Sequence, residues 1–260
     1  GVQILVSDGP TVTAVQPFMV PLNLSRTITV TGDYFFNDRL MCEWTDSEGV
    51  QTNTTATYLT PQSLTCDCPA KSKEGAVVLE VWTQGIRHSH DQIQLQYKRI
   101  NVTAVYPRLG SVTGNTMVTV TGSGFVNTPK LHCKFGPYIA SQTTWVEDYK
   151  IICRTPYFIA YKNHAADFVP VSVTFNDEDY VAGTAEYMYH LDMFVLDWYP
   201  KTGPAHGDTT VTIYGDNFVN SSSLHCLFGS KIAYATFRTK TTITCQSPQH
   251  SAGSYDVKVS

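Results

Sequence analysis

The sequence predicts an all-β protein built from three tandem sandwich domains. A unit of about 90 residues recurs three times, which is too long for one solenoid repeat and suits a small independent domain. Within each unit, short runs rich in Val, Thr, Ile, Tyr and Phe alternate between apolar and polar residues, and turn residues separate the runs. No stretch places apolar residues at helical spacing, so strands are expected throughout.

Each unit carries the same landmarks in the same order: a proline, a glycine that ends a β-type run, a phenylalanine three residues later, and two cysteines. The prolines lie 90 and 93 residues apart, and so do the glycines. In the three units the landmarks are Pro17, Gly32, Phe35, Cys42 and Cys66; Pro107, Gly122, Phe125, Cys133 and Cys153; and Pro200, Gly215, Phe218, Cys226 and Cys245.

The density of short strands predicts immunoglobulin-like sandwiches, because about seven strands with frequent turns in such a length are typical of that fold. The expected domains are residues 10–99, 100–191 and 192–260. A truncated C-terminus is one interpretation of the third domain. Residues 1–9 resemble the end of a preceding repeat, or a linker.

The junctions between the units predict how the domains are connected. Residues 97–101 and 189–193 contain neither Gly nor Pro and run directly from one unit to the next, which predicts short, stiff links and a rod-like array.

Composition excludes several classes of protein. With 18 basic and 22 acidic residues the formal net charge is −4, and the basic residues are scattered, so nucleic acid is not an expected partner. Hydrophobic residues make up 42% of the chain, enough for packed cores. The apolar runs are far shorter than the ~20 residues that span a bilayer, so a membrane would be reached only through parts outside this sequence.

Units two and three carry a further set of motifs. Each has an X-Pro opening, a Gly-x-x-Phe, a Cys-x-Phe-Gly at 133–136 or 226–229, and an Ile-x-Cys-x-x-Pro that ends at Pro156 or Pro248. These units resemble the IPT/TIG domain, the immunoglobulin-like module of plexins, the Met receptor, fibrocystin and large protist surface proteins. Unit one departs from the pattern, with Cys42-Glu-Trp44 in place of Cys-x-Phe-Gly.

The resemblance covers residues 10–260 and implies an extracellular β-sandwich used in adhesion, in recognition or as a spacer. Rel-type transcription factors use the same fold to bind DNA. The scattered basic residues and the cysteines speak against that branch.

Six of the seven cysteines recur in register, one pair in each unit. This repetition predicts three disulfides and therefore an oxidising, extracellular or cell-surface location reached through the secretory pathway. The alternative is three pairs of buried free thiols. The predicted pairs are Cys42–Cys66, Cys133–Cys153 and Cys226–Cys245.

Cys68 is the odd cysteine. A leftover cysteine in a secreted chain suggests a disulfide to another chain. It could equally be an unpaired thiol, or replace Cys66 as the partner of Cys42.

Four sequons predict N-linked glycans, three in expected loops and one, at Asn101, at a domain junction. The sequon asparagines are Asn23, Asn53, Asn101 and Asn220.

No arrangement typical of an enzyme is visible: no nucleophile with its base, no metal-ligand spacing and no phosphate-binding loop. No cofactor or metal site is therefore assigned. The acidic run at 176–179 could supply oxygen ligands for calcium at an interdomain edge, but it matches no EF-hand and reads better as a solvated hairpin.

Aromatic residues give one candidate contact surface. Tyr157, Phe158 and Tyr161 lie in an insertion between Pro156 and Pro170. They either form an exposed contact loop or fold back on their own domain. The aromatic residues that recur in register are expected in the core: Phe35, Phe125, Phe218, Tyr106, Tyr199, Trp145 and Trp198.

These observations predict a non-catalytic extracellular adhesion or recognition protein whose tandem domains form a rod that presents or forms a binding surface. The expected partner is a protein or glycan on another cell or in the extracellular matrix, or another copy of the chain. A first alternative is a structural subunit of a filament, sheath or appendage, assembled through domain edges and Cys68. A second is a receptor ectodomain of the plexin or Met kind.

Overall fold

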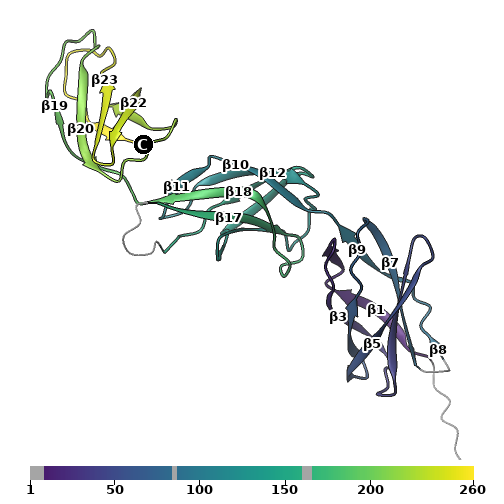
Figure 1. The fold of residues 1–260 in the computed structure, drawn as a ribbon. Coiled ribbons are helices and arrows are strands. Elements are labelled where there is room, and N and C mark those ends of the chain that lie inside the picture. The colour runs from purple at the N-terminus through teal and green to yellow at the C-terminus, as the bar shows by residue number, and fades with distance from the viewer. Residues whose placement is uncertain (1–8, 84–86, 160–165) are drawn as a thin grey trace, which may run out of the picture. The chain divides into compact units, whose positions relative to one another are not determined.

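The computed structural model describes residues 9–83, 87–159 and 166–260 (Figure 1). In this part of the chain every regular element is a strand, and no helix is present that could cross a membrane. The strands form three groups, β1–β9 (domain 1), β10–β18 (domain 2) and β19–β24 (domain 3). The all-β class and the three sandwiches are therefore confirmed. Residues 1–8, where the end of a preceding repeat is expected, lie outside the described residues.

Domain 1 is one continuous sheet that folds over into two layers, in the order β1-β3-β6-β5-β4-β7-β9-β2, with β8 paired to β7. Strand β5 joins the layers because it pairs with β6 and with β4. Its strands are β1 (Thr11–Gln16), β2 (Met19–Pro21), β3 (Arg26–Asp33), β4 (Leu40–Asp46), β5 (Gln51–Thr60), β6 (Ser63–Cys68), β7 (Gly75–Thr83), β8 (Arg87–His88) and β9 (Ile93–Lys98).

In domain 1, alternate residues along the strands are buried, as the alternating sequence pattern predicts. On β3, Ile28 and Val30 are fully buried while the intervening threonines face solvent. Trp44 of β4 is also fully buried, and its indole N–H donates to the hydroxyl of Thr54 at 2.9 Å. Cys42-Glu-Trp44, which departs from the motif of the other units, thus supplies the same inward-facing aromatic position.

Domain 2 has two sheets, β10-β12-β16-β15 and β11-β18-β17-β13-β14. The short strand β11 pairs parallel with the last strand, β18, as β2 pairs parallel with β9 in domain 1. Its strands are β10 (Asn101–Tyr106), β11 (Leu109–Ser111), β12 (Met117–Ser123), β13 (His132–Phe135), β14 (Tyr138–Ile139), β15 (Gln142–Glu147), β16 (Lys150–Arg154), β17 (Ala166–Thr174) and β18 (Val181–His190).

Domain 3 has six strands in the order β19-β20-β23-β22-β21-β24. Its core contains Ile213, Phe218, Cys226 and Ile243. Its strands are β19 (Phe194–Tyr199), β20 (Thr210–Asp216), β21 (His225–Phe228), β22 (Lys231–Thr239), β23 (Thr242–Gln246) and β24 (Val257–Val259).

A β-bulge in the first strand of each domain explains the Gly-x-x-Phe landmark. The register shifts between Val12 and Ala14 in β1, and the same shift recurs in β10 and β19. Opposite each bulge, a Cβ on the landmark glycine would overlap a carbonyl oxygen of the first strand and the ring of the landmark phenylalanine. Only glycine fits, and the phenylalanine ring fills the space beneath it.

The bulge also overturns part of the sequence prediction. Strict alternation from Val102 would point Tyr106 inward, but the bulge shifts the phase so that Val105 is buried and Tyr106 is 77% exposed. Tyr199 of β19 is 71% exposed for the same reason. Trp145 is also on the surface, whereas the landmark phenylalanines are buried as predicted.

Candidate functional site

Each domain contains one buried disulfide. The Cα–Cα distances are 6.3 Å for Cys42–Cys66, 6.3 Å for Cys133–Cys153 and 6.4 Å for Cys226–Cys245. These are the pairs that the sequence analysis predicts, and the distances lie within the usual range for disulfides. In domain 2 the bond joins β13 to β16 and thus ties the two sheets together.

Cys68 lies in the core of domain 1 and is not exposed. Alternate residues of β6 face inward, so Leu64, Cys66 and Cys68 share the core face of the strand. Cys42 is bonded to Cys66, so Cys68 does not replace Cys66. The prediction of an interchain disulfide at Cys68 is corrected, because its sulfur cannot reach another chain while domain 1 is folded.

We expect a thiol reagent to label native Cys68 more than about 100-fold more slowly than the unfolded chain, because the reagent must wait for the domain to open. Intact-mass measurement after labelling should find one modified thiol in denaturant without reductant, and none after brief native treatment. Rapid native labelling, or a covalent dimer lost in a Cys68→Ser variant, would contradict the buried position.

The described start of the insertion in domain 2 separates the candidate contact residues into a buried one and an exposed one. Phe158 is 5% exposed, and its ring stacks on that of Tyr189 with the centroids 4.5 Å apart. Its backbone N–H donates to the carbonyl of Val112 at 2.9 Å, which fixes the segment against its own domain. The prediction that Phe158 is a contact residue is therefore wrong. Tyr157 is 65% exposed and stays a candidate, whereas Tyr161 lies outside the described residues.

The acidic run forms a closed turn. The side-chain oxygen of Asn176 accepts hydrogen bonds from the backbone N–H groups of Glu178 (3.1 Å) and Asp179 (2.9 Å), and Asp177 has a left-handed φ of 70°. Among the described residues, no group of three or more His, Cys, Asp or Glu side chains is placed to hold a metal ion. The solvated hairpin stays the preferred interpretation, and calcium binding at this edge stays the untested alternative.

All four sequon asparagines are exposed. Asn23 lies in the turn between β2 and β3, and Asn220 lies in the loop between β20 and β21. Asn53 lies within β5 rather than in a loop, with its side chain on the solvent side, and Asn101 begins the edge strand β10. A glycan can therefore project from each position, and their occupancy stays a prediction.

An exposed apolar face lies on domain 3. Tyr234 and Ile232 of β22 are 80% and 65% exposed, and they pair with His225 and Leu227 of β21. The rings of His225 and Tyr234 are 4.8 Å apart. These four residues, hereafter the β22 face, combine an aromatic ring, an imidazole and two aliphatic side chains on two rigid strands.

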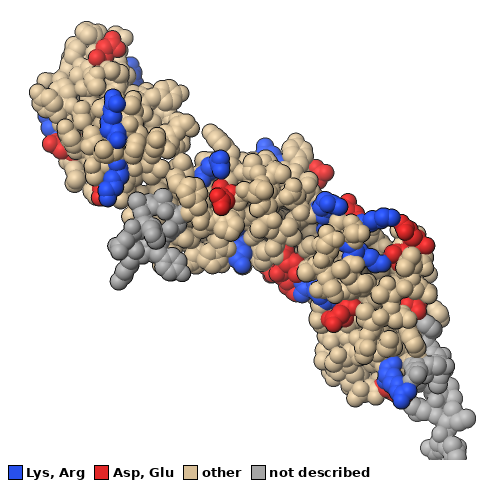
Figure 2. Space-filling view, viewed as in Figure 1, with Lys and Arg blue, Asp and Glu red and all other residues tan. Residues whose placement is uncertain are grey.

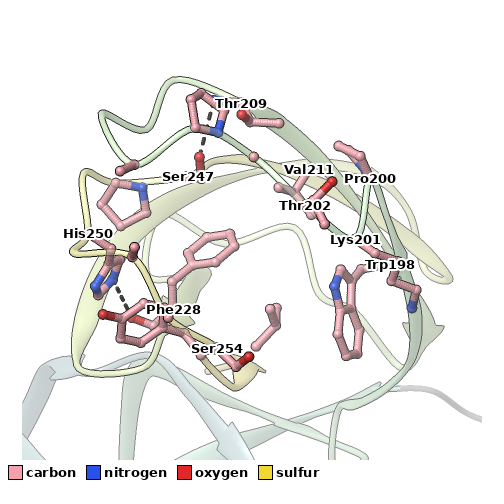
Figure 3. Close-up of a pocket in the computed structure, with 18 of the residues that line it drawn as sticks. Trp198, Pro200, Lys201, Thr202, Thr209, Val211, Phe228, Ser247, His250 and Ser254 are labelled. Atoms are coloured by element: carbon pink, nitrogen blue, oxygen red, sulfur yellow. Dashed lines mark hydrogen bonds between the residues drawn. The ribbon is translucent and has the colours of Figure 1, made fainter.

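A groove of about 620 Å³ opens on another side of domain 3 (Figure 3). Trp198 stands on one side, while Phe228 and His250 lie across from it. The ammonium of Lys201 lies 3.8 Å from the centre of the Trp198 ring, and the His250 imidazole hydrogen-bonds the carbonyl of Phe228 at 2.9 Å.

The rim of the groove is polar, and its lining includes residues 200–205 and 250–255. Hydroxyl, imidazole, amine and backbone groups contribute to it, and no carboxylate does. The groove thus combines apolar side chains with hydrogen-bonding groups.

Charged groups are mixed over the surface. On the face in Figure 2, basic and acidic residues lie among uncharged ones, and several basic side chains line up on domain 3. The exclusion of nucleic acid as a partner stays a prediction from the sequence.

The sequence analysis missed both the β22 face and the groove. The alternating pattern does not show that Ile232 and Tyr234 are exposed, because Ile and Tyr also occur at inward-facing positions of strands. The groove leaves no signal either, because its lining comes from three separate segments around residues 198–211, 228 and 247–257.

The fold, the repeated disulfide and the repeated bulge define a tandem array of immunoglobulin-like sandwich domains. The family model described as the IPT/TIG domain matches residues 10–97, 101–189 and 193–260. The chain belongs to this family.

Fibrocystin-L from Homo sapiens is 26% identical over 160 residues, which are 61% of this chain and 4% of that protein. The plexin A4 extracellular region is 17% identical over 98% of this chain and 33% of its own, with a TM-score of 0.41. A Bacteroides ovatus protein named SGBP-B, in complex with a mixed-linkage heptasaccharide, is 16% identical over 98% of this chain and 65% of its own, with a TM-score of 0.29. The chain spans only a small part of fibrocystin-L, and the two structures are too distant to assign a function.

Proposed function

We propose that the chain is part of a non-catalytic extracellular or cell-surface recognition protein. Its IPT/TIG domains would present or form a surface that binds a protein or glycan on another cell or in the extracellular matrix. The three intradomain disulfides support this location, since such bonds persist in oxidising compartments. The exposed sequons agree with it. The rod that the sequence predicts stays a prediction.

The β22 face is the observation that carries the recognition function. Tyrosine buries a large area on binding at a low entropic cost, and exposed aromatic residues are enriched among the residues that dominate binding energy. Tyr234 is held on a paired strand and Ile232 lies on the same face, so a partner would meet a preorganised surface.

The test compares the natively processed protein with a Tyr234→Ala/Ile232→Ala variant in binding to cell surfaces and immobilised glycans. Since both side chains are largely exposed, we expect an unchanged melting temperature and at least about tenfold weaker binding. Thr236→Ala, at an exposed site on the same strand, is the matched control. Equal binding by both variants would reject the β22 face as the recognition surface.

The location is tested separately by peptide mapping of native material without reduction. We expect three disulfide-linked peptide pairs, one free thiol at Cys68, and glycans on the sequon asparagines. Seven free cysteines in native material would overturn the extracellular assignment.

The alternative of a structural subunit relied on an interchain disulfide at Cys68. Because Cys68 is buried, this covalent link between subunits is not supported. The edge strands β1, β10 and β19 are still available for lateral pairing, but a glycan at Asn101 would obstruct the β10 edge. Recognition is therefore the better supported function. A receptor ectodomain of the plexin or Met kind stays a prediction.

A further inference from the structure

One strand of domain 3 leaves part of its backbone unpaired. Residues 231–234 of β22 pair with β21, and residues 235–239 pair with β23. The N–H of Ala235 donates to the carbonyl of Leu224, on the β21 side, at 3.1 Å. Because the backbone groups of a strand alternate between its two edges, those of Ile232 and Tyr234 point to the other side. Among the described residues of domain 3, no strand pairs with them there.

The same edge is polar or short in the other two domains. The residue that follows the first disulfide cysteine pairs with Ile232 in domain 3, with Asn53 in domain 1 and with Ile139 in domain 2. Asn53 belongs to a sequon, so a glycan on it would cover the edge of β5. Strand β14 of domain 2 has only two residues. Both features protect an edge from further pairing, and the edge of β22 shows neither.

The side chains beside the unpaired backbone groups are apolar. Ile232 and Tyr234 are both largely exposed and lie on one face of β22. A strand added along this edge would place alternate side chains directly opposite these two, where β-branched and aromatic side chains form the favourable pairs. Backbone hydrogen bonds would thus supply affinity, and the side chains would supply selectivity.

The segment that forms this edge carries only positive charge. Residues 217–255 contain no Asp or Glu, whereas Lys231, Arg238 and Lys240 lie among them and are exposed. The ammonium of Lys231 donates to the carbonyl of Gln249 at 2.6 Å, which holds it at the start of β22. Figure 2 shows basic side chains aligned on domain 3.

The carboxylates of domain 3 belong to other strands and loops. They lie on β19, on or before β20, and before β24, at Asp197, Asp208, Asp216 and Asp256. The charge along β22 is therefore complementary to an acidic partner, which it would attract, whereas a basic partner would be repelled.

We propose that the free edge of β22 binds an extended, acidic peptide segment of a partner protein by strand addition. The backbone of the segment pairs with Ile232 and Tyr234, and its β-branched or aromatic side chains lie opposite theirs. Carboxylates at the two ends of the segment lie near Lys231 and Arg238. This inference rests on the recognition function proposed above and narrows the partner to a protein rather than a glycan.

The first experiment uses the synthetic peptide acetyl-Glu-Glu-Val-Thr-Val-Thr-Val-Glu-Glu-amide and measures amide exchange of the 260-residue protein by NMR. Saturating peptide should slow exchange at the amides of Ile232 and Tyr234 by at least about tenfold. The amide of Ala233 should change little, because it already points toward β21. Absence of saturable binding, or unchanged exchange of Ile232 and Tyr234 at saturation, would overturn strand addition.

N-methylation of the peptide separates backbone pairing from side-chain contact. Two peptides of the same sequence carry N-methyl groups on alternate residues, one on the odd and one on the even positions. One of them should bind at least about tenfold more weakly, because it loses the hydrogen bonds to β22, and the other should bind like the parent. Equal binding by the two peptides would mean that side chains alone hold the segment, against strand addition.

Charge reversal tests the acidic character of the partner. Arg238→Glu/Lys240→Glu should weaken peptide binding by at least about tenfold at low salt and reduce its salt dependence. Arg108→Glu/Lys130→Glu is the matched control, because it reverses two exposed charges in domain 2. Equal binding by the two variants, or tighter binding of a peptide with Lys in place of Glu, would contradict an acidic partner.

The strand-addition proposal and the recognition function can fail separately. If Tyr234→Ala/Ile232→Ala loses the peptide but keeps wild-type binding to cell surfaces, the acceptor edge is supported and the β22 face is rejected as the recognition surface. If the same variant loses cell-surface binding while the wild-type protein does not bind the peptide, the recognition function is supported and strand addition is overturned.

Discussion

Removal of the Cys133–Cys153 disulfide by a Cys133→Ala/Cys153→Ala double substitution is expected to lower the free energy of unfolding of domain 2 by about 3 kcal/mol. The bond closes a loop with a sequence separation of 20 and ties the two sheets together, so its loss frees the unfolded chain and loosens the folded domain. Hydrogen exchange of strands β12, β13 and β16 measures this stability separately from that of the other domains.

Reduction of the wild-type protein serves as the control for this prediction, since it should produce the same loss in domain 2 without any change of sequence. A loss well under 1 kcal/mol in both experiments would show that the bond contributes little.

Gly122→Ala is expected to destabilise domain 2 by about 3 kcal/mol, the upper end of the usual cost of overpacking. The added methyl group would overlap the carbonyl oxygen of Asn101 and the ring of Phe125, and the first of these belongs to the backbone of a paired strand. Relief would require β10 to separate from β12. Denaturant unfolding followed by hydrogen exchange in β10 and β12 measures the effect.

Ser123→Ala is the matched control, because Ser123 is exposed and adjacent on the same strand. It should change stability by less than about 0.5 kcal/mol. Equal effects of the two substitutions would mean that the bulge relaxes around the methyl group, and that the landmark glycine has another cause.

The sequence by itself determined the features that repeat. The period-two alternation predicts which face of β3 is buried, because successive side chains of a strand point to opposite sides. Six cysteines recur at equivalent positions of the three units and predict the three disulfides. If two such positions lie close together in one unit, they lie close together in all three. The landmark glycines mark a position where no Cβ fits, although the sequence does not say what fills the space.

Only the tertiary structure decided whether a side chain is buried or exposed at two kinds of position. In the first kind a bulge interrupts the alternation of a strand, and in the second kind the side chain contacts residues distant in sequence. One extra residue in β10 turns Tyr106 outward, and the sequence does not mark where the bulge lies. Phe158 is buried because the insertion folds back onto Tyr189, a contact between residues distant in sequence. The burial of Cys68 depends on which strands are neighbours, and pairing between strands is a property of the folded sheet rather than of any single segment.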